Sequence, residues 1–241
     1  MRLHVSVPKI LARLALFAVL TLWLSNTSCR QAEQDVVLAP TYGAEFAPLS
    51  VGTFWEYQFD TLERNILPVL REEAGTVFQR WTLQDTLEHT PYYTSFRLLV
   101  EQRSDSQQAY QPRRLDVLIK RFDGALVLQS EEGNIQLLQI PFTKGTGWNL
   151  RAFAAGGGAT PYQVRFRGLS NGNVAQFSGS RDSTCLSSQL ETLAFQQNIG
   201  LQSRYSYKAT FVEDPLNPCA QPVQYQTRQV KRWTLLRSGR R

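Results

Sequence analysis

The sequence predicts an all-β protein in which an antiparallel sheet curves into a barrel or half-barrel. Three observations support this class: apolar and polar residues alternate in most segments after residue 50, glycine-containing turn pairs separate these segments, and helical periodicity is scarce. Alternation with period two is typical of strands that bury one face and expose the other. The same strands could stack as a β-sandwich, which is the alternative architecture.

Two segments alternate most clearly. VGTFWEYQF places Trp55 and Tyr57 on one face and Glu56 on the other, and YQVRFRG does the same with Val164 and Arg165. Two further segments are assigned inward faces in the same way: LDVLIKR with Leu115, Val117 and Ile119, and LQSRYSYKATF with Leu201, Tyr205, Tyr207, Ala209 and Phe211.

Turn residues predict which strands are neighbours. Asp123–Gly124, Gly133–Asn134 and Asn171–Gly172 each separate two alternating segments, as expected for tight hairpins. Another hairpin is expected around residues 196–200, and residues 229–237 are expected to form the closing strand.

Helices are expected to be few and short, at most one or two. Residues 65–75 could form a single turn, because Pro68 interrupts them. Residues 185–195 have leucines at spacings of four and three, which suit a strand or a short helix, and the strand is favoured. PLSVGTFWEY and PFTKGTGWNL share a pattern of Pro, Gly and Trp that suggests the openings of two corresponding halves.

Residues 1–28 have the build of a secretory signal peptide. Arg2, Lys9 and Arg13 precede or border an apolar run over residues 14–24, and this stretch contains no acid. Eleven residues at about 1.5 Å each cover about half of a hydrocarbon core of about 30 Å, so a retained membrane helix is the weaker interpretation.

Cys29 follows this run, and two routes of cleavage are open. Cleavage just before Cys29 would resemble the processing of bacterial lipoproteins: Thr27 and Ser28 fit a lipobox, whereas Asn26 departs from it and Leu24 lies two positions early. Cleavage at another small residue would give plain secretion. We favour lipidation of Cys29, which predicts an exported protein of the cell envelope, anchored in the outer membrane through its N-terminal lipid.

The cysteine count supports this anchor. Lipid on Cys29 leaves Cys185 and Cys219 as a pair, which an oxidising compartment would allow to form a disulfide worth about 3 to 4 kcal/mol. Two unpaired buried thiols are the alternative. No CxxC occurs and His89 is the only histidine after the signal, so no metal site is expected.

Residues 29–47 contain Pro40 and Gly43 and lack a lasting period, which indicates a lipid-anchored tether. Residues 48–241 are then expected to form a single β-rich domain. The formal net charge is +6, and three of the basic residues belong to the signal. The other Lys and Arg residues are scattered, whereas a nucleic-acid-binding protein would concentrate them in a stripe, so no nucleic-acid partner is expected.

The start of the domain resembles the opening of uncharacterised lipoproteins of Bacteroidota, which follow a Pro-Leu-x-x-Gly-x-x-Trp-x-Tyr pattern. A later phrase of those chains also has a counterpart here. The matching residues are Pro48, Leu49, Gly52, Trp55 and Tyr57, then Phe195, Ile199, Gly200 and Leu201. The resemblance covers a small part of the 241 residues and implies an exported, all-β domain without an assigned activity.

These residues also have structural roles that physics alone suggests. Gly52 allows a sharp turn into the first strand, and Trp55 supplies about 200 Å² of apolar surface to a core. Tyr57 shares the face of Trp55, and Gly200 suits a turn that needs positive φ. Together they are expected to form a structural core motif.

No catalytic residues and no cofactor are assigned. His89 lies beside Pro91 at an expected strand end, and the acidic pairs at residues 72–73 and 131–132 lie in expected turns. The glycine-rich residues 154–160 lack the lysine of a P-loop.

Anchor, tether and missing catalytic groups together predict a non-catalytic interaction or scaffolding component of the envelope. The aromatic faces favour an alternative, a carrier or binding module for an apolar ligand, lipid or peptide in a concave β-sheet cavity.

Overall fold

The computed structural model describes residues 41–65, 70–131, 133–154, 162–179, 182–183, 187–211 and 225–240. They form one antiparallel sheet of 13 strands and a single short helix, η1 (Ala44–Phe46), which confirms the all-β class. None of the helical structure described is long and apolar enough to cross a bilayer.

The strands are numbered in the order of the chain. They are β1 (Thr53–Asn65), β2 (Arg71–His89), β3 (Tyr93–Arg103), β4 (Gln111–Arg121), β5 (Ala125–Ser130), β6 (Gly133–Gln139), β7 (Gly147–Asn149), β8 (Gln163–Ser170), β9 (Val174–Gly179), β10 (Asp182–Ser183), β11 (Ser187–Gln196), β12 (Gly200–Phe211) and β13 (Tyr225–Arg240).

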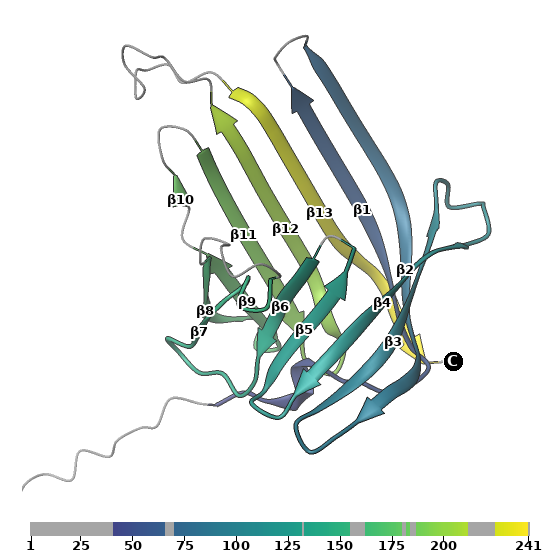
Figure 1. Ribbon diagram of the computed structural model, residues 1–241, viewed down its shortest axis with the longest axis vertical. Coiled ribbons are helices and arrows are strands. Elements are labelled where there is room, and N and C mark those ends of the chain that lie inside the picture. The colour runs from purple at the N-terminus through teal and green to yellow at the C-terminus, as the bar shows by residue number, and fades with distance from the viewer. Residues whose placement is uncertain are drawn as a thin grey trace, which may run out of the picture. The chain divides into compact units, whose positions relative to one another are not determined.

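The sheet consists of two meanders joined by the last strand. Its order is β6-β5-β4-β3-β2-β1-β13-β12-β11-β9-β8-β7, with β10 paired to β11. Figure 1 shows β11, β12, β13, β1 and β2 rising as one tall wall, while β3 to β6 cross over its lower part. β13 therefore lies between the first strand of one meander and the last strand of the other.

The two ends of the strand order approach each other, so the sheet is nearly closed into a barrel. The Gln136 N–H of β6 donates to the Leu150 carbonyl just after β7 (2.9 Å), and the Trp148 indole N–H donates to the Gln136 carbonyl (2.8 Å). The edge at β6 is thus occupied by the same chain. We name the part of the barrel enclosed by this contact the closed end.

The four expected hairpins are confirmed. β4–β5, β5–β6, β8–β9 and β11–β12 pair as the turn residues indicate, with Gly124 at φ 86° and Asn171 at φ 51°. The helical turn expected in residues 65–75 is wrong where it can be compared, because residues 71–75 lie in β2, whereas the strand favoured for residues 185–195 is confirmed where they are described, because residues 187–195 lie in β11. Pairing to neighbouring strands outweighs the local leucine spacing there.

Residues 42–47, which the sequence alone assigns to the tether, pack against the domain. Tyr42 forms an isolated bridge with Phe142, with hydrogen bonds of 2.8 and 2.9 Å between their backbones, and Phe46 is only 1% exposed. The rings of Tyr42, Phe46 and Phe142 lie 5.3 to 6.0 Å apart. Residues 42–47 are therefore part of the domain, because aromatic side chains without a regular period still fill its closed end.

Two of the assigned inward faces are wrong. In β4 the buried side chains are Asp116 and Leu118, while Leu115 is 61% exposed. The segment LDVLI has apolar residues on both faces, so its alternation is ambiguous, and pairing of Leu118 with buried Phe96 decides the outcome. Asp116 tolerates burial because Arg114 Nε donates to its carboxylate at 2.9 and 3.1 Å.

In β12 a bulge inverts the face. The register shifts between Ala194 and Phe195, so Leu201 faces inward, but beyond it Arg204 is the residue that pairs with buried Leu193. Tyr205, Tyr207 and Ala209 consequently lie on the face opposite Arg204, although Tyr207 and Ala209 are buried there, at 8% and 3% exposed.

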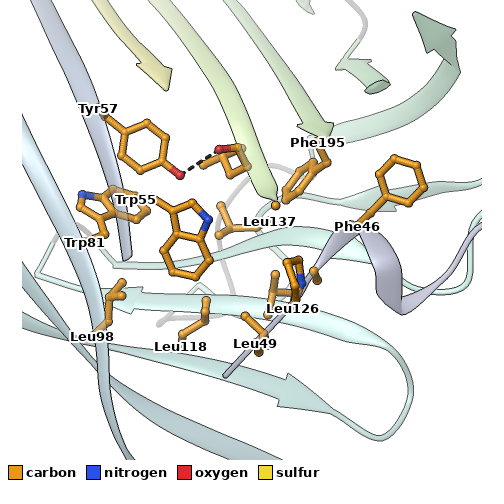
Figure 2. Close-up of a pocket in the computed structure, with 14 residues that line it drawn as sticks. Phe46, Leu49, Trp55, Tyr57, Trp81, Leu98, Leu118, Leu126, Leu137 and Phe195 are labelled. Atoms are coloured by element: carbon orange, nitrogen blue, oxygen red, sulfur yellow. Dashed lines mark hydrogen bonds between the residues drawn. The ribbon is translucent and has the colours of Figure 1, made fainter. Parts of the chain in front are cut away.

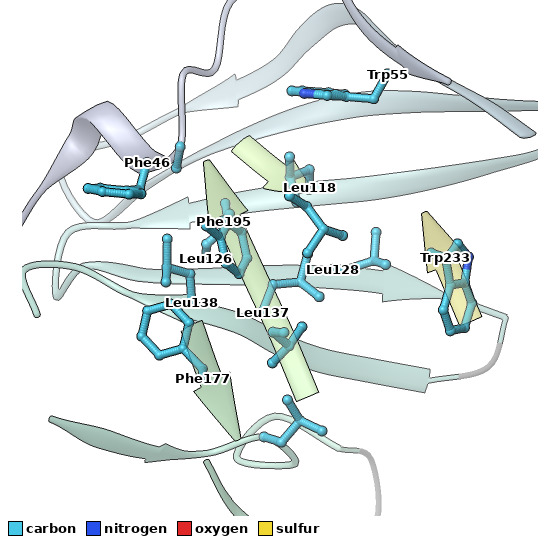
Figure 3. Packing of buried hydrophobic residues seen from close by; sticks show 14 of the residues in the cluster. Phe46, Trp55, Leu118, Leu126, Leu128, Leu137, Leu138, Phe177, Phe195 and Trp233 are labelled. Atoms are coloured by element: carbon cyan, nitrogen blue, oxygen red, sulfur yellow. The ribbon is translucent and has the colours of Figure 1, made fainter. Parts of the chain in front are cut away.

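The core fills the closed end with aliphatic and aromatic side chains. Figure 3 shows Leu118, Leu126 and Leu138 from the crossing strands packed toward Phe177 and Phe195 of the opposite wall. The Phe177 ring lies 5.0 Å from Trp148 and 6.0 Å from Phe195, in edge-to-face contacts that favour a fixed arrangement.

Each meander opens with a buried tryptophan. Trp55 in β1 and Trp148 in β7 are both 5% exposed, and each indole N–H donates to a backbone carbonyl, those of Ile199 (2.6 Å) and Gln136 (2.8 Å). The shared Pro, Gly and Trp pattern thus marks the starts of the two meanders.

Glu56 does not face water as the alternation suggested. On the outer face of β1, it accepts hydrogen bonds from Arg80 Nε of β2 (2.8 Å) and Arg237 Nε of β13 (2.7 Å), and its side chain is 3% exposed. The guanidinium of Arg80 also lies 4.0 Å from the ring centre of Tyr110. This cluster, Glu56 with Arg80 and Arg237, links the first strand to both of its neighbours.

Candidate functional site

The residues singled out in the sequence fall into two groups. Cys29, Cys185 and Cys219 lie outside the described residues. Gly52, Trp55, Tyr57 and Gly200 are all described, and the last three meet at the closed end. Within the described ranges, no group of three or more His, Cys, Asp or Glu side chains could hold a metal ion.

Tyr57 and Gly200 fit closely around Trp55. The Tyr57 hydroxyl donates to the Leu201 carbonyl (2.9 Å), and burial raises the pKa of this phenol well above its usual range. A Cβ on Gly200 would lie 3.3 Å from Trp55 Nε1, and Gly200 has φ 101°. Gly52 has φ 86°, and its N–H donates to the Leu83 carbonyl (2.8 Å) just before β1.

Beside this motif lies a small apolar cavity of about 30 Å³. Figure 2 shows Leu49, Trp55, Leu98, Leu118 and Leu126 around it. That volume is close to one water molecule, and the lining offers almost no polar surface, so we expect the cavity to be dry. An acyl chain does not fit, because side chains fill the closed end.

Above the closed end, the inner face of the tall wall changes from apolar to polar in three successive rows of cross-strand partners. The rows run through β11, β12, β13, β1 and β2. They are Leu193, Arg204, Trp233, Phe59, Val77; then Glu191, Ser206, Lys231, Thr61, Gly75; then Gln189, Lys208, Gln229, Glu63, Glu73.

The first row forms an aromatic floor. Phe59 and Trp233 stack with ring centres 4.5 Å apart, and the Arg204 guanidinium lies 4.9 Å from the Trp233 ring centre. The indole N–H of Trp233 is buried and has no hydrogen-bond partner among the described residues. This floor is where packed core gives way to open space.

The second row carries a buried carboxylate. Glu191 is 6% exposed and accepts hydrogen bonds from Ser206 Oγ (2.7 Å) and Arg204 Nε (3.4 Å). Tyr162 helps to fix it, since the Glu191 N–H donates to the Tyr162 hydroxyl (2.9 Å).

Basic groups gather around Lys208 in the third row. Arg151, from the segment after β7, reaches the same wall, where its Nη2 donates to the Gln189 side chain (3.0 Å). Burial lowers the pKa of Lys208, and the positive charges of Arg151, Lys231 and Arg204 lower it further, whereas Glu191 opposes them. Positive charge is therefore concentrated on the β12 side of the wall.

The β1–β2 side of the same wall is acidic and open. A groove of about 770 Å³ lies there, within the range of small-molecule sites. It is lined by Phe59, Thr61, Leu62, Glu63, Glu72, Glu73, Ala74, Gly75, Gln229 and Lys231. Two strand spacings of about 4.8 Å separate Lys208 from Glu63, so opposite charges lie about 10 Å apart on one concave face.

Sequence reasoning missed Arg204, Lys208 and Glu191, because it assigned the aromatic residues of β12 to the inner face. The signal that could have found them is the alternation of Arg204, Ser206 and Lys208 itself, which is regular but polar.

Comparisons with known proteins give little further information. No family model matches the chain, and no curated protein matches it. A solved structure of lipid–protein interactions in lipovitellin is similar over 79% of this chain, with 11% sequence identity and a TM-score of 0.42. The similarity covers 26% of that longer chain.

Proposed function

We propose that this chain is a non-catalytic binding module of the cell envelope, moored through Cys29, that holds an amphiphilic ligand in the groove above its aromatic floor. The observation that carries the proposal is the succession of the three rows, apolar at Trp233 and charged at Lys208 and Glu63. A ligand that matches it has an apolar part at one end and charges at the other.

The charges in and beside the groove also select the headgroup. Lys208 lies on the β12 side and Glu63 on the β1–β2 side, about 10 Å apart, and Lys231 of β13 lines the groove, so a headgroup with both charges can satisfy both sides. An anion alone would leave Glu63 facing it, and a cation alone would face Lys208. A zwitterionic amphiphile therefore fits better than either.

Four amphiphiles with the same dodecyl chain test this proposal by calorimetry below their micelle concentrations: dodecylphosphocholine, dodecyl phosphate, dodecyltrimethylammonium and dodecyl maltoside. We expect the phosphocholine to bind about tenfold more tightly than the maltoside, since one charge-assisted hydrogen bond contributes about 1.5 kcal/mol. Equal affinity for all four would refute the headgroup selection, and absence of binding would refute the groove as the site.

Matched variants separate the two sides of the groove. Lys208→Met should remove the preference for phosphocholine over trimethylammonium, and Glu63→Gln should remove its preference over phosphate. Lys144→Met changes an exposed lysine in the turn between β6 and β7 and should leave all four affinities unchanged.

An envelope protein that inserts a polypeptide segment into the same groove is the second candidate, because amphoteric side chains also recognise peptides. A photoreactive benzoylphenylalanine in place of Thr61 distinguishes the two in native cells. Lipid adducts support the amphiphile, whereas adducts with one recurrent protein support an interaction component.

Lipid anchoring through Cys29 has a separate test. Cys29→Ala should release the chain from the membrane fraction, and unchanged partitioning into detergent would refute the anchor.

A further inference from the structure

Two aromatic side chains project into solvent at neighbouring turns. Phe122, between β4 and β5, is 87% exposed, and Tyr92, between β2 and β3, is 77% exposed, the two highest values among the large hydrophobic residues described. Their backbones touch, because the Phe122 N–H donates to the Tyr92 carbonyl (2.7 Å). We call Tyr92 and Phe122 the aromatic tips.

Both tips are held by ordered turns. Thr90 Oγ1 accepts hydrogen bonds from the N–H groups of Tyr92 (3.2 Å) and Tyr93 (3.1 Å). On the other turn, the Gly124 N–H donates to the Arg121 carbonyl (3.1 Å), and the Ala125 N–H donates to Asp123 Oδ1 (3.2 Å). Single exposed apolar residues are common on soluble proteins, but an adjacent pair on fixed turns is a small apolar patch.

The chain from the N-terminal segment joins the domain at this same end. Tyr42 pairs with Phe142, and the Ile140 N–H donates to the Gly124 carbonyl (2.9 Å), so two backbone contacts connect residue 42 to the turn that carries Phe122. Figure 1 shows the segment around η1 and the β2–β3 and β4–β5 turns at the lower end of the barrel.

The length of the preceding chain keeps this end near an anchored Cys29. Twelve positions separate Cys29 from residue 41. A flexible chain of that length has a root-mean-square span of about 20 Å, and even a fully extended one reaches only about 40 Å.

We propose that the aromatic tips insert into the interfacial region of the bilayer that anchors the chain, so that the barrel stands on the membrane with its groove pointing away. The proposal rests on the lipid anchor of the proposed function but not on its ligand. Phe and Tyr rings partition into the headgroup region, where an apolar body and a polar edge are both satisfied.

The charges beside the aromatic tips predict which lipid compositions the tips should contact. Arg121 pairs with Asp123 (3.2 Å), and the exposed Lys120 offsets the charge of Glu88, so the charged groups beside the tips are largely balanced. Contact should therefore occur on zwitterionic phosphatidylcholine and should depend little on salt.

The groove would then face away from the membrane. β1 runs from Thr53 at the lower end of the wall to Asn65 at its upper end (Figure 1), and 13 residues at about 3.3 Å each extend about 40 Å. A ligand would reach the groove from the aqueous side.

Photo-crosslinking tests the orientation. The acylated chain is reconstituted into phosphatidylcholine vesicles that contain a lipid with a headgroup-proximal diazirine, and adducts are mapped by mass spectrometry. We expect adducts at residues 90–93 and 120–124, and at least a fivefold loss of them in a Tyr92→Ser, Phe122→Ser double variant. Leu115→Ser, a change at an exposed leucine on a strand face, should alter the yield less than twofold.

Three results would overturn the proposal: adducts concentrated elsewhere, the same yield from the double variant, or a mature chain without acyl groups. Titration of the double variant with dodecylphosphocholine distinguishes a failure of the proposed membrane contact from a failure of the proposed ligand binding in the groove. Its affinity should stay within twofold of the unmodified chain, because the tips and the groove lie at opposite ends of the wall.

Discussion

Replacing Glu56 by glutamine tests how the barrel is held together at its first strand. The carboxylate of Glu56 accepts hydrogen bonds from Arg80 and Arg237, the former from β2 and the latter from β13. Glutamine has nearly the same shape but no charge, and its NH2 group points a donor at a guanidinium. Glu56→Gln therefore removes the electrostatic link and leaves the packing almost unchanged.

The magnitude follows from the exposure of the partners. Arg80 has a side chain 15% exposed, so its bond to Glu56 is shielded and contributes about 1.5 to 3 kcal/mol. Arg237 is 63% exposed, and its bond contributes at most about 1 kcal/mol. We expect Glu56→Gln to lower the free energy of unfolding by about 3 kcal/mol, or the Tm by about 6 to 12 °C for a domain of this size.

The pH dependence gives a sharper test. Burial alone would raise the pKa of Glu56, but the hydrogen bonds from Arg237 and Arg80 outweigh it and lower the pKa from 4.5 to about 2. The pKa of Glu56 is lower in the folded than in the unfolded chain. The contribution of its ionised carboxylate to the free energy of unfolding is therefore complete above about pH 4.5 and is lost as the pH falls toward 2.

Urea unfolding followed by tryptophan fluorescence, at several pH values between 7 and 2.5, measures the difference in free energy of unfolding between the unmodified chain and Glu56→Gln. The gap between the unmodified chain and Glu56→Gln should shrink steadily below pH 4.5. Glu73→Gln, in an exposed pair with Arg71, is the matched control and should cost less than about 0.5 kcal/mol. A gap that stays constant down to pH 3, or one below about 1 kcal/mol at pH 7, would refute the reasoning.

Three further changes have defined outcomes. Gly200→Ala should destabilise the domain by about 1 to 3 kcal/mol in urea, since alanine disfavours φ 101° and its Cβ would crowd Trp55; a neutral result would contradict this. Lys208→Met should raise the Tm slightly, because like charges and burial already lower the pKa of this amine, while zwitterionic ligand binding weakens. Leu118→Asp should cost more than about 3 kcal/mol, whereas Leu115→Asp should be almost neutral, and the reverse order in thermal scans would show that β4 faces the other way.

Much of the architecture could be predicted because local chemistry determines it. The Asp123–Gly124 and Asn171–Gly172 turns supply the positive φ that tight hairpins need, and strict alternation in YQVRFRG leaves only one face to bury. These signals lie within a few residues of each other, so they can be recognised without knowledge of the partner strands.

The groove could not be predicted in the same way. Its inner face depends on bulges, such as the shift between Ala194 and Phe195, that exchange the two faces of a strand without a clear sequence signal. Beyond that bulge the inner residues are Arg204 and Lys208, whose polarity resembles that of an ordinary solvent face. Glu56 was missed for a related reason, since its burial depends on two arginines distant in the sequence, Arg80 of β2 and Arg237 of β13.

The position of β13 has a consequence for how the protein is made. The last 16-residue strand supplies the junction between two meanders, pairing with β1 on one side and β12 on the other. Until β13 is in place, β1 and β12 each lack a partner on one side. A nascent chain that has not yet reached β13, or a chain truncated before it, would therefore expose two unpaired strand edges, which makes that interval vulnerable to aggregation.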